Sequence, residues 1–300
     1  DTRFNEDALR ILRALRFASV YGFSIEENTS KSIFKNADLL KNIATERVIS
    51  EFLKLICGKD AVKILDAYRE TIAVIIPEIT VMFNFNQNNI HHSYDLWQHT
   101  LTALGTIEPN PILRMTMLLH DIGKPSVKTT DNSGQSHFQG HQLESKKIAD
   151  RILHRLRLPS DFINKTLLLI EYHDVRFNGS KKLMKKVMNV LGTDLTKQLL
   201  EVEYADISAQ SEYQREEKLG YLKTAKTHLN EIIKDNECFK LSQLDINGKD
   251  VLNLGVKEGR DVGNILDYLL MLVVDANVPN KKSILISKAK EYIYGNQINK

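Results

Sequence analysis

Apolar residues recur at steps of three and four positions along most of this 300-residue chain. Near its start, Ala8, Leu12 and Leu15 follow that spacing, which predicts an amphipathic helix over residues 5–21 that Gly22 ends. Runs rich in Leu, Ile, Lys and Glu continue toward the end of the chain, and only 6 prolines and 14 glycines interrupt them. The pattern predicts an all-α protein.

Polar stretches and helix breakers divide this pattern into regions. Pro77 and Glu78 close a first block of helices, and the amide-rich stretch 84–89 is typical of a linker. Glycines then break the last part of the chain into shorter helices. The three expected helical regions are residues 1–83, 90–215 and 216–300.

The composition is that of an ordinary globular protein, with 42% apolar and 26% charged residues. Cys57 and Cys238 lie far apart and offer neither a disulfide framework nor a paired zinc motif, which fits a reducing cytoplasm. Because the sequence contains no apolar run of about 18 residues and no basic leader, we expect neither export nor a membrane partner. The net charge of +3 is too small to indicate a partner by itself.

The strongest chemical signal is the doublet His120-Asp121, which follows an apolar stretch. Adjacent side chains on a helix point about 100° apart, so both can reach one ion only at a helix end or a bend. Gly123 and Pro125 supply such an end. The doublet therefore predicts half of a metal site, although a lone pair of this kind is more often a helix-terminal histidine beside a solvated aspartate.

Further imidazoles and carboxylates flank the doublet along the chain. His99 precedes it, and His141, His173 and Asp206 follow it. Imidazole together with carboxylate is the ligand set of a divalent transition metal or of a mixed two-metal centre. This ordered series favours a metal centre over an isolated pair.

The series resembles the HD metal-dependent phosphohydrolase superfamily. The resemblance implies a first metal with four ligands: His99, His120, Asp121 and Asp206. Members of the superfamily with a second metal use two further histidines and the doublet's aspartate, here Asp121, as the bridge, and the matching histidines are His141 and His173. The expected metal is Mg, Mn or Ni.

A hydrolytic role follows from that resemblance. The metal would activate water for attack on a phosphoester, and Lys124 would offer positive charge to the phosphate. We therefore expect three catalytic residues: His120, Asp121 and Lys124.

A second signal lies at the start of the chain, where Glu6, Asp7 and Arg10 form the pattern Glu-Asp-x-x-Arg. Asp7 and Arg10 are three positions apart, so we expect their side chains on one surface of a helix, where an ordinary exposed pair contributes only about 0.2–0.5 kcal/mol. The surrounding sequence closely resembles the neck helix of class II, bacterial-type CCA-adding tRNA nucleotidyltransferases and their poly(A) polymerase relatives. In that family the aspartate and the arginine act as a template for the incoming base. Arg47 matches a family arginine that organises the template, although a surface arginine at a helix start is an equally good interpretation.

The template hypothesis has a chemical basis. Cytosine and adenine each present an amino donor beside a ring-nitrogen acceptor, whereas uracil and guanine present the reverse. A carboxylate that only accepts, next to a guanidinium that only donates, would pair with the first two bases and repel the others. The resemblance thus implies tRNA, CTP and ATP as partners, and it implies four nucleotide-binding residues: Glu6, Asp7, Arg10 and Arg47.

Nucleotidyl transfer in that family needs an Asp-x-Asp pair for Mg on a separate head domain, and this sequence contains no Asp-x-Asp. We expect the chain to be the neck (1–83), HD domain (90–215) and tRNA-binding tail (216–300) of such an enzyme, with the head upstream, and to be unable to add nucleotides by itself. One alternative is a stand-alone HD phosphohydrolase that acts on nucleotides or cyclic phosphodiesters. Another is a non-catalytic tRNA-binding fragment with a structural metal.

Four lysines crowd one predicted helix: Lys181, Lys182, Lys185 and Lys186. Such runs are usually solvated faces, and contact with the phosphate backbone of tRNA is the alternative. Among the remaining histidines, His137 has no predicted partner. His91 and His92 are expected on the surface or in helix packing, with His92 the nearer to the metal site.

Overall fold

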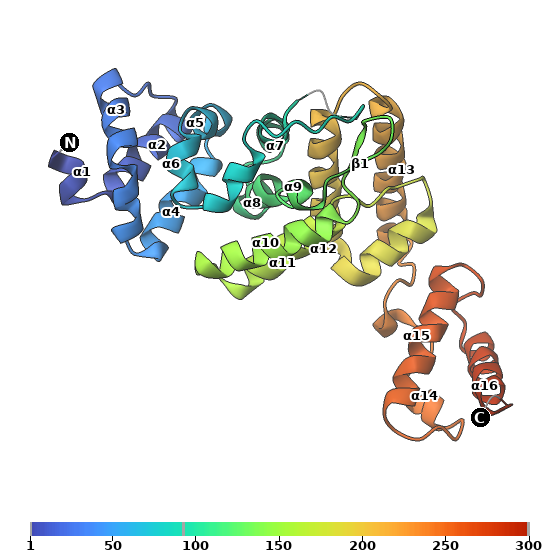
Figure 1. The fold of residues 1–300 in the computed structure, drawn as a ribbon. Helices are drawn as coiled ribbons and strands as arrows, with labels where there is room; N and C mark the ends of the chain where they lie inside the picture. The colour runs from blue at the N-terminus through green and yellow to red at the C-terminus, as the bar shows by residue number, and fades with distance from the viewer. Residues whose placement is uncertain (1, 92–93, 299–300) are drawn as a thin grey trace. The chain divides into compact units, whose positions relative to one another are not determined.

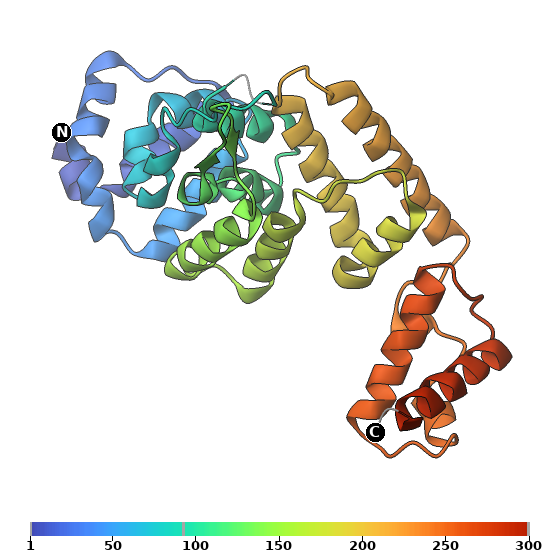
Figure 2. The same cartoon turned by 45° about the vertical axis from the view of Figure 1, so that its right-hand side comes forward.

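Helices make up nearly all of the regular structure in this computed structural model, which describes residues 2–91 and 94–298 (Figure 1). The all-α prediction is confirmed, since the only strands within those ranges are two strands of two residues each. Figure 2 gives a second view, and in both views α10 (His141–Arg155) and α11 (Ser160–Tyr172) run side by side. None of the described helices is both long and apolar enough to cross a membrane.

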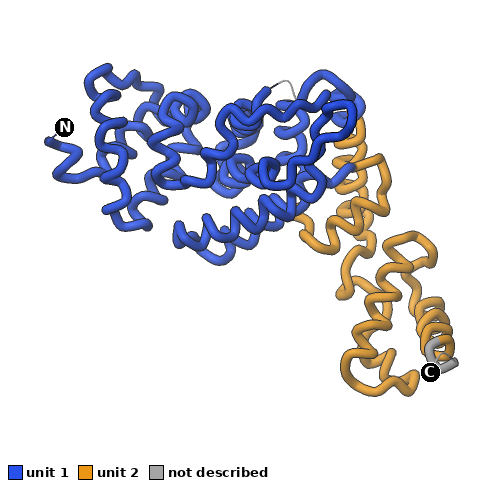
Figure 3. The backbone as a smooth tube through the Cα atoms, in the orientation of Figure 1, with its two compact units in different colours: residues 1–176, 198–219 blue, residues 177–197, 220–300 orange. Residues whose placement is uncertain are grey.

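The chain divides into two compact units, which are coloured separately in Figure 3. The first comprises residues 1–176 and 198–219, and the second comprises residues 177–197 and 220–300. Helix α12 (Lys181–Ala209) contributes to both, and Gly192 interrupts it with a φ of 71°, a conformation that glycine adopts without strain. The three domain ranges expected from the sequence stay a prediction.

The first unit begins with a series of short helices. They are α1 (Thr2–Glu6), α2 (Leu9–Tyr21), α3 (Glu27–Asn36), η1 (Ala37–Asn42), α4 (Thr45–Ile56), α5 (Ala61–Ala67), α6 (Arg69–Ala73) and η2 (Pro77–Met82). The single helix predicted over residues 5–21 is wrong in one respect, because the chain leaves the helix at Asp7, whose Oδ1 accepts a hydrogen bond from the amide of Leu9 at 3.1 Å. The predicted end is confirmed, since Gly22 has a φ of 77° and its amide donates to the carbonyl of Ala18.

The helices that carry the candidate metal ligands follow. They are α7 (Leu96–Thr106), α8 (Pro111–Leu119), α10, α11 and α12. The short α9 (Lys124–Val127) lies between α8 and α10 in the chain, and α13 (Arg215–Lys234) follows α12. Between α9 and α10, the turn-rich loop expected from the sequence forms an antiparallel hairpin of β1 (Thr129–Thr130) and β2 (Ser136–His137).

Apolar faces hold the helices of the first unit together. Helix α2 packs on α4, α8 lies against α7 and α11, and α10 lies against α11. Trp97 of α7 is fully buried against the edge of Phe83, and its indole Nε1 donates to Asp66 at 3.1 Å. Because the ring is buried and its one polar atom has a partner, Trp97 fixes α7 to the helices that precede it.

The second unit has an apolar core of its own, with Val251, Leu269 and Leu285 fully buried. Its last elements are η3 (Leu241–Gln243), α14 (Gly248–Leu252), α15 (Arg260–Val274) and α16 (Lys282–Ile298). The four clustered lysines of α12 form ion pairs here: Lys181 and Lys185 with Glu237, and Lys182 and Lys186 with Asp275. Each lysine therefore has an acidic partner within the unit, which leaves the cluster less charge to offer to phosphates than the sequence suggested.

Candidate metal centre

Side chains from five helices or their ends meet in the first unit. His99 lies within α7, His120 is the C-cap of α8, and Asp121 follows in the turn before α9. The other contributors are His141 at the start of α10, His173 at the C-cap of α11 and Asp206 on α12. The predicted position of the doublet at a helix end is confirmed.

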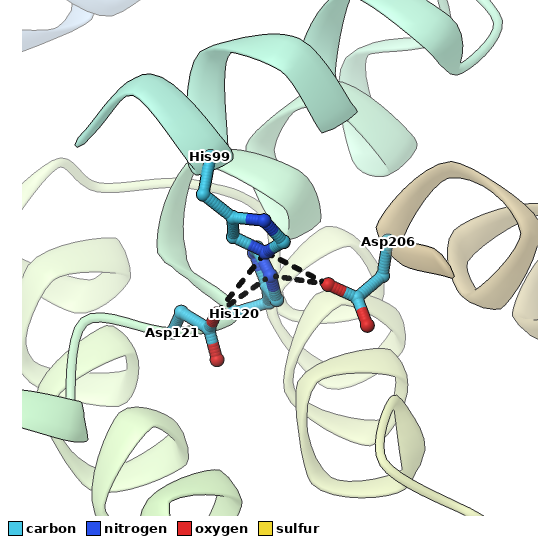
Figure 4. Close-up of side chains that lie close together, drawn as sticks. All are labelled: His99, His120, Asp121 and Asp206. Atoms are coloured by element: carbon cyan, nitrogen blue, oxygen red, sulfur yellow. Dashed lines mark hydrogen bonds and ion pairs between the residues drawn. The ribbon is translucent and has the colours of Figure 1, made fainter. Parts of the chain in front are cut away.

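The first group of four side chains converges on one point, as Figure 4 shows. His99 Nε2 lies 2.9 Å from Asp206 Oδ1 and 3.5 Å from Asp121 Oδ2. His120 Nε2 lies 3.4 Å from Asp206 Oδ1 and 3.2 Å from Asp121 Oδ2. The structure thus brings together residues more than a hundred positions apart, as the sequence predicted.

The second oxygen of Asp121 faces the two remaining histidines. His141 Nε2 lies 3.2 Å and His173 Nε2 lies 3.6 Å from Asp121 Oδ1. Asp121 therefore lies between the two groups and turns one oxygen to each, which is the arrangement of a bridging carboxylate.

Backbone carbonyls orient the four histidines. The Nδ1 atoms of His120, His141 and His173 lie 2.7–2.9 Å from the carbonyl oxygens three residues before them. Nδ1 of His99 lies 3.3 Å from the carbonyl oxygen of Ala209. Because Nδ1 faces a carbonyl in each ring, Nε2 is the nitrogen that points to the shared centre and that would coordinate a metal there.

These donor atoms fit a divalent metal. Nε2 of His141 and Nε2 of His173 lie 3.1 Å apart, so either a shared proton or a cation bound by both nitrogens would stabilise this pair. His120 Nε2 and Asp121 Oδ1 are buried without a hydrogen bond among the described residues, which carries a cost that a bound ion would remove. Imidazole nitrogens with carboxylate oxygens are donors that Mn, Ni and similar ions accept.

The carboxylates set the charge of the site. Burial opposes a charged His120, but Asp121 and Asp206 outweigh it and raise the pKa of His120 to about 10. Burial likewise opposes a charged Asp121, but His120 and Lys124 hold the pKa of that carboxyl well below its usual range. Without metal, the centre therefore holds a proton where a cation would otherwise lie.

Lys124 begins α9, and its ammonium lies 2.6 Å from Asp121 Oδ2. It also donates to Oε1 of Gln87 at 3.1 Å. Gln87 is 1% exposed and comes from the stretch that the sequence indicated as a linker. Sequence reasoning missed this residue, and its only signal was the run of amide side chains immediately before the helices that carry the candidate ligands.

Gly123 has a different function from the one its sequence suggested. Helix α8 already ends at Leu119, and the φ of Gly123 is −81°, which any residue adopts. A Cβ at Gly123 would lie 2.5 Å from the amide nitrogen of Ser145 and 2.8 Å from the carbonyl oxygen of His141. The missing side chain lets the start of α10 approach the turn that carries Asp121.

The residues of the Glu-Asp-x-x-Arg pattern lie at the start of the first unit, and with Arg47 we call them the neck cluster (Glu6, Asp7, Arg10 and Arg47). Arg10 Nη1 pairs with Glu6 Oε2 at 3.0 Å, and Arg47 Nη2 lies 3.3 Å from Asp7 Oδ2. No ion pair within the described residues joins Asp7 to Arg10: Asp7 lies in the break between α1 and α2, and Arg10 lies within α2.

The other histidines have ordinary surroundings. His137 Nε2 lies 2.8 Å from Asp131 Oδ2 on the exposed hairpin. The ring of His91 packs against Tyr213, as expected for a packing histidine. His92 lies outside the described residues.

Two family models match the chain. One is described as "Probable RNA and SrmB- binding site of polymerase A" and matches residues 22–83. The other is described as tRNA nucleotidyltransferase domain 2 and matches residues 141–289. Together they cover parts of both compact units.

Curated relatives agree with these models. The CC-adding tRNA nucleotidyltransferase of Thermus thermophilus is 29% identical over an alignment of 294 positions, which covers 92% of this chain and 65% of that protein. The multifunctional CCA protein of Legionella pneumophila is 30% identical over an alignment of 203 positions, which covers 61% of this chain and 48% of that protein. The chain thus spans less than two thirds of the length of either relative.

The fold has a counterpart among solved structures. The CCA-adding enzyme of Bacillus stearothermophilus, solved in complex with CTP, superposes with a TM-score of 0.68 at 20% identity. The match covers 100% of this chain and 65% of that enzyme. From the family models, the relatives and this shared fold, we conclude that the chain belongs to the CCA-adding tRNA nucleotidyltransferase family.

Proposed function

We propose that the metal centre is an HD-type phosphohydrolase site. The observation that carries this proposal is the convergence of two ligand groups that share Asp121: His99, His120, Asp121 and Asp206 in one, and Asp121, His141 and His173 in the other. A bound Mg, Mn or Ni ion would lower the pKa of a coordinated water and neutralise charge on a phosphoester.

The protein's own groups have separate tasks in this proposal. Asp121 divides its two oxygens between the ligand groups, so it sets their spacing. Lys124 is held beside Asp121 by Gln87 and adds a positive charge at the edge of the centre, where it can attract a phosphate. The backbone carbonyls keep every Nε2 directed at the centre before any ligand arrives.

Hydrolysis of bis(p-nitrophenyl) phosphate by the 300-residue chain tests this proposal. We expect turnover with Mn²⁺, Ni²⁺ or Mg²⁺ and none in EDTA. Asp121→Ala should abolish turnover while the helical circular dichroism spectrum persists, and His137→Ala, which changes an exposed histidine outside the centre, should leave turnover unchanged. Turnover that survives in Asp121→Ala, or none in the parent with any of the three metals, argues against the proposal.

We also propose that the chain is the neck, body and tail of an enzyme that adds or repairs the 3′ CCA end of tRNA with CTP and ATP in the cytoplasm. Its family membership and the similarity along 92% of the chain to a CC-adding enzyme support this proposal. Because the similarity to that enzyme extends over nearly the whole chain, a stand-alone phosphohydrolase is the less favoured alternative. The nucleotidyl transfer itself would use Mg on a head domain.

In this proposal the neck cluster reads the incoming base. Asp7 accepts hydrogen bonds, and Arg10 donates them, as the edges of C and A require. Arg47 would hold the Asp7 carboxylate in place, which its 3.3 Å contact supports.

Replacing both template residues by alanine tests this assignment in the chain joined to a nucleotidyltransferase head. Each lost charge-assisted contact is worth about 1.5–3 kcal/mol, so selection of C and A over U and G should fall by about one to two orders of magnitude. Hydrolysis at the metal centre should not change, because it uses other residues. Full retention of base selectivity would reduce Asp7 and Arg10 to surface ion pairs.

A further inference from the structure

Asp206 uses its two carboxylate oxygens for different partners. Oδ1 faces the metal centre, 2.9 Å from His99 Nε2 and 3.4 Å from His120 Nε2. Oδ2 accepts a hydrogen bond from Nε2 of Gln210 at 2.7 Å. In Figure 4 one oxygen of Asp206 is joined to the histidines and the other points away from them. The outer oxygen therefore has a partner that is not a candidate metal ligand.

Gln210 is held in turn by Lys218. The ammonium of Lys218 donates to Oε1 of Gln210 at 2.6 Å. Both side chains are half-buried, Gln210 immediately after α12 and Lys218 in the first turn of α13. A chain of two hydrogen bonds thus runs from Lys218 through Gln210 to Asp206.

The chemistry of the three groups fixes the direction of this chain. An amide side chain can turn either its oxygen or its nitrogen toward a neighbour. The ammonium of Lys218 only donates, so it selects the oxygen of Gln210, and the NH₂ group is then directed at Asp206, whose ionised carboxylate only accepts. Lys218 therefore sets which way the side-chain amide of Gln210 is turned.

The backbone around Gln210 is anchored at the same place. Nη2 of Arg215 donates to the carbonyl oxygen of Gln210 at 2.7 Å, and the amide of Ser211 donates to the carbonyl oxygen of His91 at 2.8 Å. The carbonyl of Ala209, one residue earlier, faces Nδ1 of His99. The end of α12 therefore supports two candidate ligands at once, His99 by a carbonyl and Asp206 by a side-chain amide.

We propose that Gln210 and Lys218 are positioning residues that hold Asp206 so that only Oδ1 faces the metal. The inference rests on the proposed metal centre and adds two residues outside its ligand set. Outer partners of this kind keep a ligating carboxylate in one orientation, and their loss typically weakens metal binding by about 10–100-fold.

Titration of the metal-free chain with Mn²⁺, with free Mn²⁺ followed by electron paramagnetic resonance, tests the proposal without a substrate. Gln210→Met keeps the length of the side chain but removes both hydrogen bonds, and it should weaken Mn²⁺ binding at least tenfold. Lys218→Met should weaken binding less, because the amide of Gln210 can still reach Asp206 for part of the time. Lys218→Arg keeps a donor and should restore most of the affinity.

Lys226→Met is the matched control, because it makes the same exchange at an exposed position two turns further along α13. It should leave Mn²⁺ affinity unchanged. The free energy of unfolding in EDTA should be similar for Lys218→Met and Lys226→Met, which separates positioning from general stability. If Gln210→Met does not fold, the Mn²⁺ affinities of Lys218→Met, Lys218→Arg and Lys226→Met test the positioning role by themselves.

Two negative results have different meanings. If the parent chain binds no Mn²⁺, the proposed metal centre is wrong, and this inference falls with it. If the parent binds Mn²⁺ and both Gln210→Met and Lys218→Met bind it with the parent's affinity, the metal centre stands and the positioning role is wrong.

Discussion

The metal centre and the neck cluster differ in how much solvent reaches their side chains. His99 and His120 are 0% exposed and Asp121 is 1% exposed, whereas Arg10 is 46% and Arg47 is 55% exposed. Charges in a buried site interact strongly, and their hydrogen bonds hold them in one geometry. Exposed ion pairs are worth about 0–1 kcal/mol and do not fix a side chain. The side chains of the candidate metal centre are thus held in one geometry, whereas the exposed ion pairs of the neck cluster do not hold their side chains in place.

Gly123→Ala at the candidate metal centre should change the free energy of unfolding most. The new Cβ would press on the backbone of α10, 2.5 Å from the Ser145 amide nitrogen, and move His141 away from Asp121. We expect a loss of about 1–3 kcal/mol in the free energy of unfolding, with weaker metal binding. Urea unfolding followed by circular dichroism measures the loss.

Gly220→Ala is the control for that change. Gly220 lies within α13 and has open space where a Cβ would be, so alanine should stabilise the helix by up to about 1 kcal/mol. Equal effects of the two substitutions would show that the approach of α10 to the Asp121 turn is not tight.

The pH dependence of stability should be the next largest difference. Folding raises the pKa of His120 from 6.5 to about 10 in the absence of metal. A raised pKa stabilises the folded state fully below pH 6.5, and this contribution is lost as pH rises toward 10. Unfolding of the chain in EDTA should therefore become easier over that range, as urea melts at pH 6, 8 and 10 would show. His120→Asn should flatten the dependence, and a parent chain whose stability rises from pH 6.5 to 10 contradicts this assignment.

Substitution in the neck cluster should have the smallest effect on stability. Arg47→Met removes an exposed pair with Asp7, so the free energy of unfolding should change by less than about 1 kcal/mol. Arg16→Met, which removes a less exposed pair with Glu51, should cost more because both side chains are at most 19% exposed. A larger loss for Arg47→Met than for Arg16→Met would mean that the neck cluster is already rigid.

The sequence indicated the candidate ligands of the proposed metal centre better than the residues that support them. Few residue types bind metals, so histidines in a fixed order around the doublet His120-Asp121 are recognisable in a sequence. This order indicated His99 and Asp206 although they are far apart in the chain. Gln87, Gln210 and Lys218 carry no such signature, since amides and lysines occur on every surface. Only the folded chain brings them to the centre.

The fold was predictable to a similar degree. Apolar spacing and few prolines indicated helices, but spacing alone did not indicate the break at Asp7, whose carboxylate accepts a hydrogen bond from the amide of Leu9. The lysines of α12 looked like a solvated or phosphate-binding face, because their partners Glu237 and Asp275 are distant in sequence. Long-range pairing of charges has no local pattern.

Anomalous diffraction from crystals of this chain soaked in Mn²⁺ tests the central claim most directly. The account predicts one ion that would be held by His99, His120, Asp121 and Asp206, and a second ion that would be held by Asp121, His141 and His173. Asp121→Ala crystals should lose both peaks or keep only one. Strong Mn²⁺ peaks elsewhere on the chain, with none between these side chains, would contradict the account.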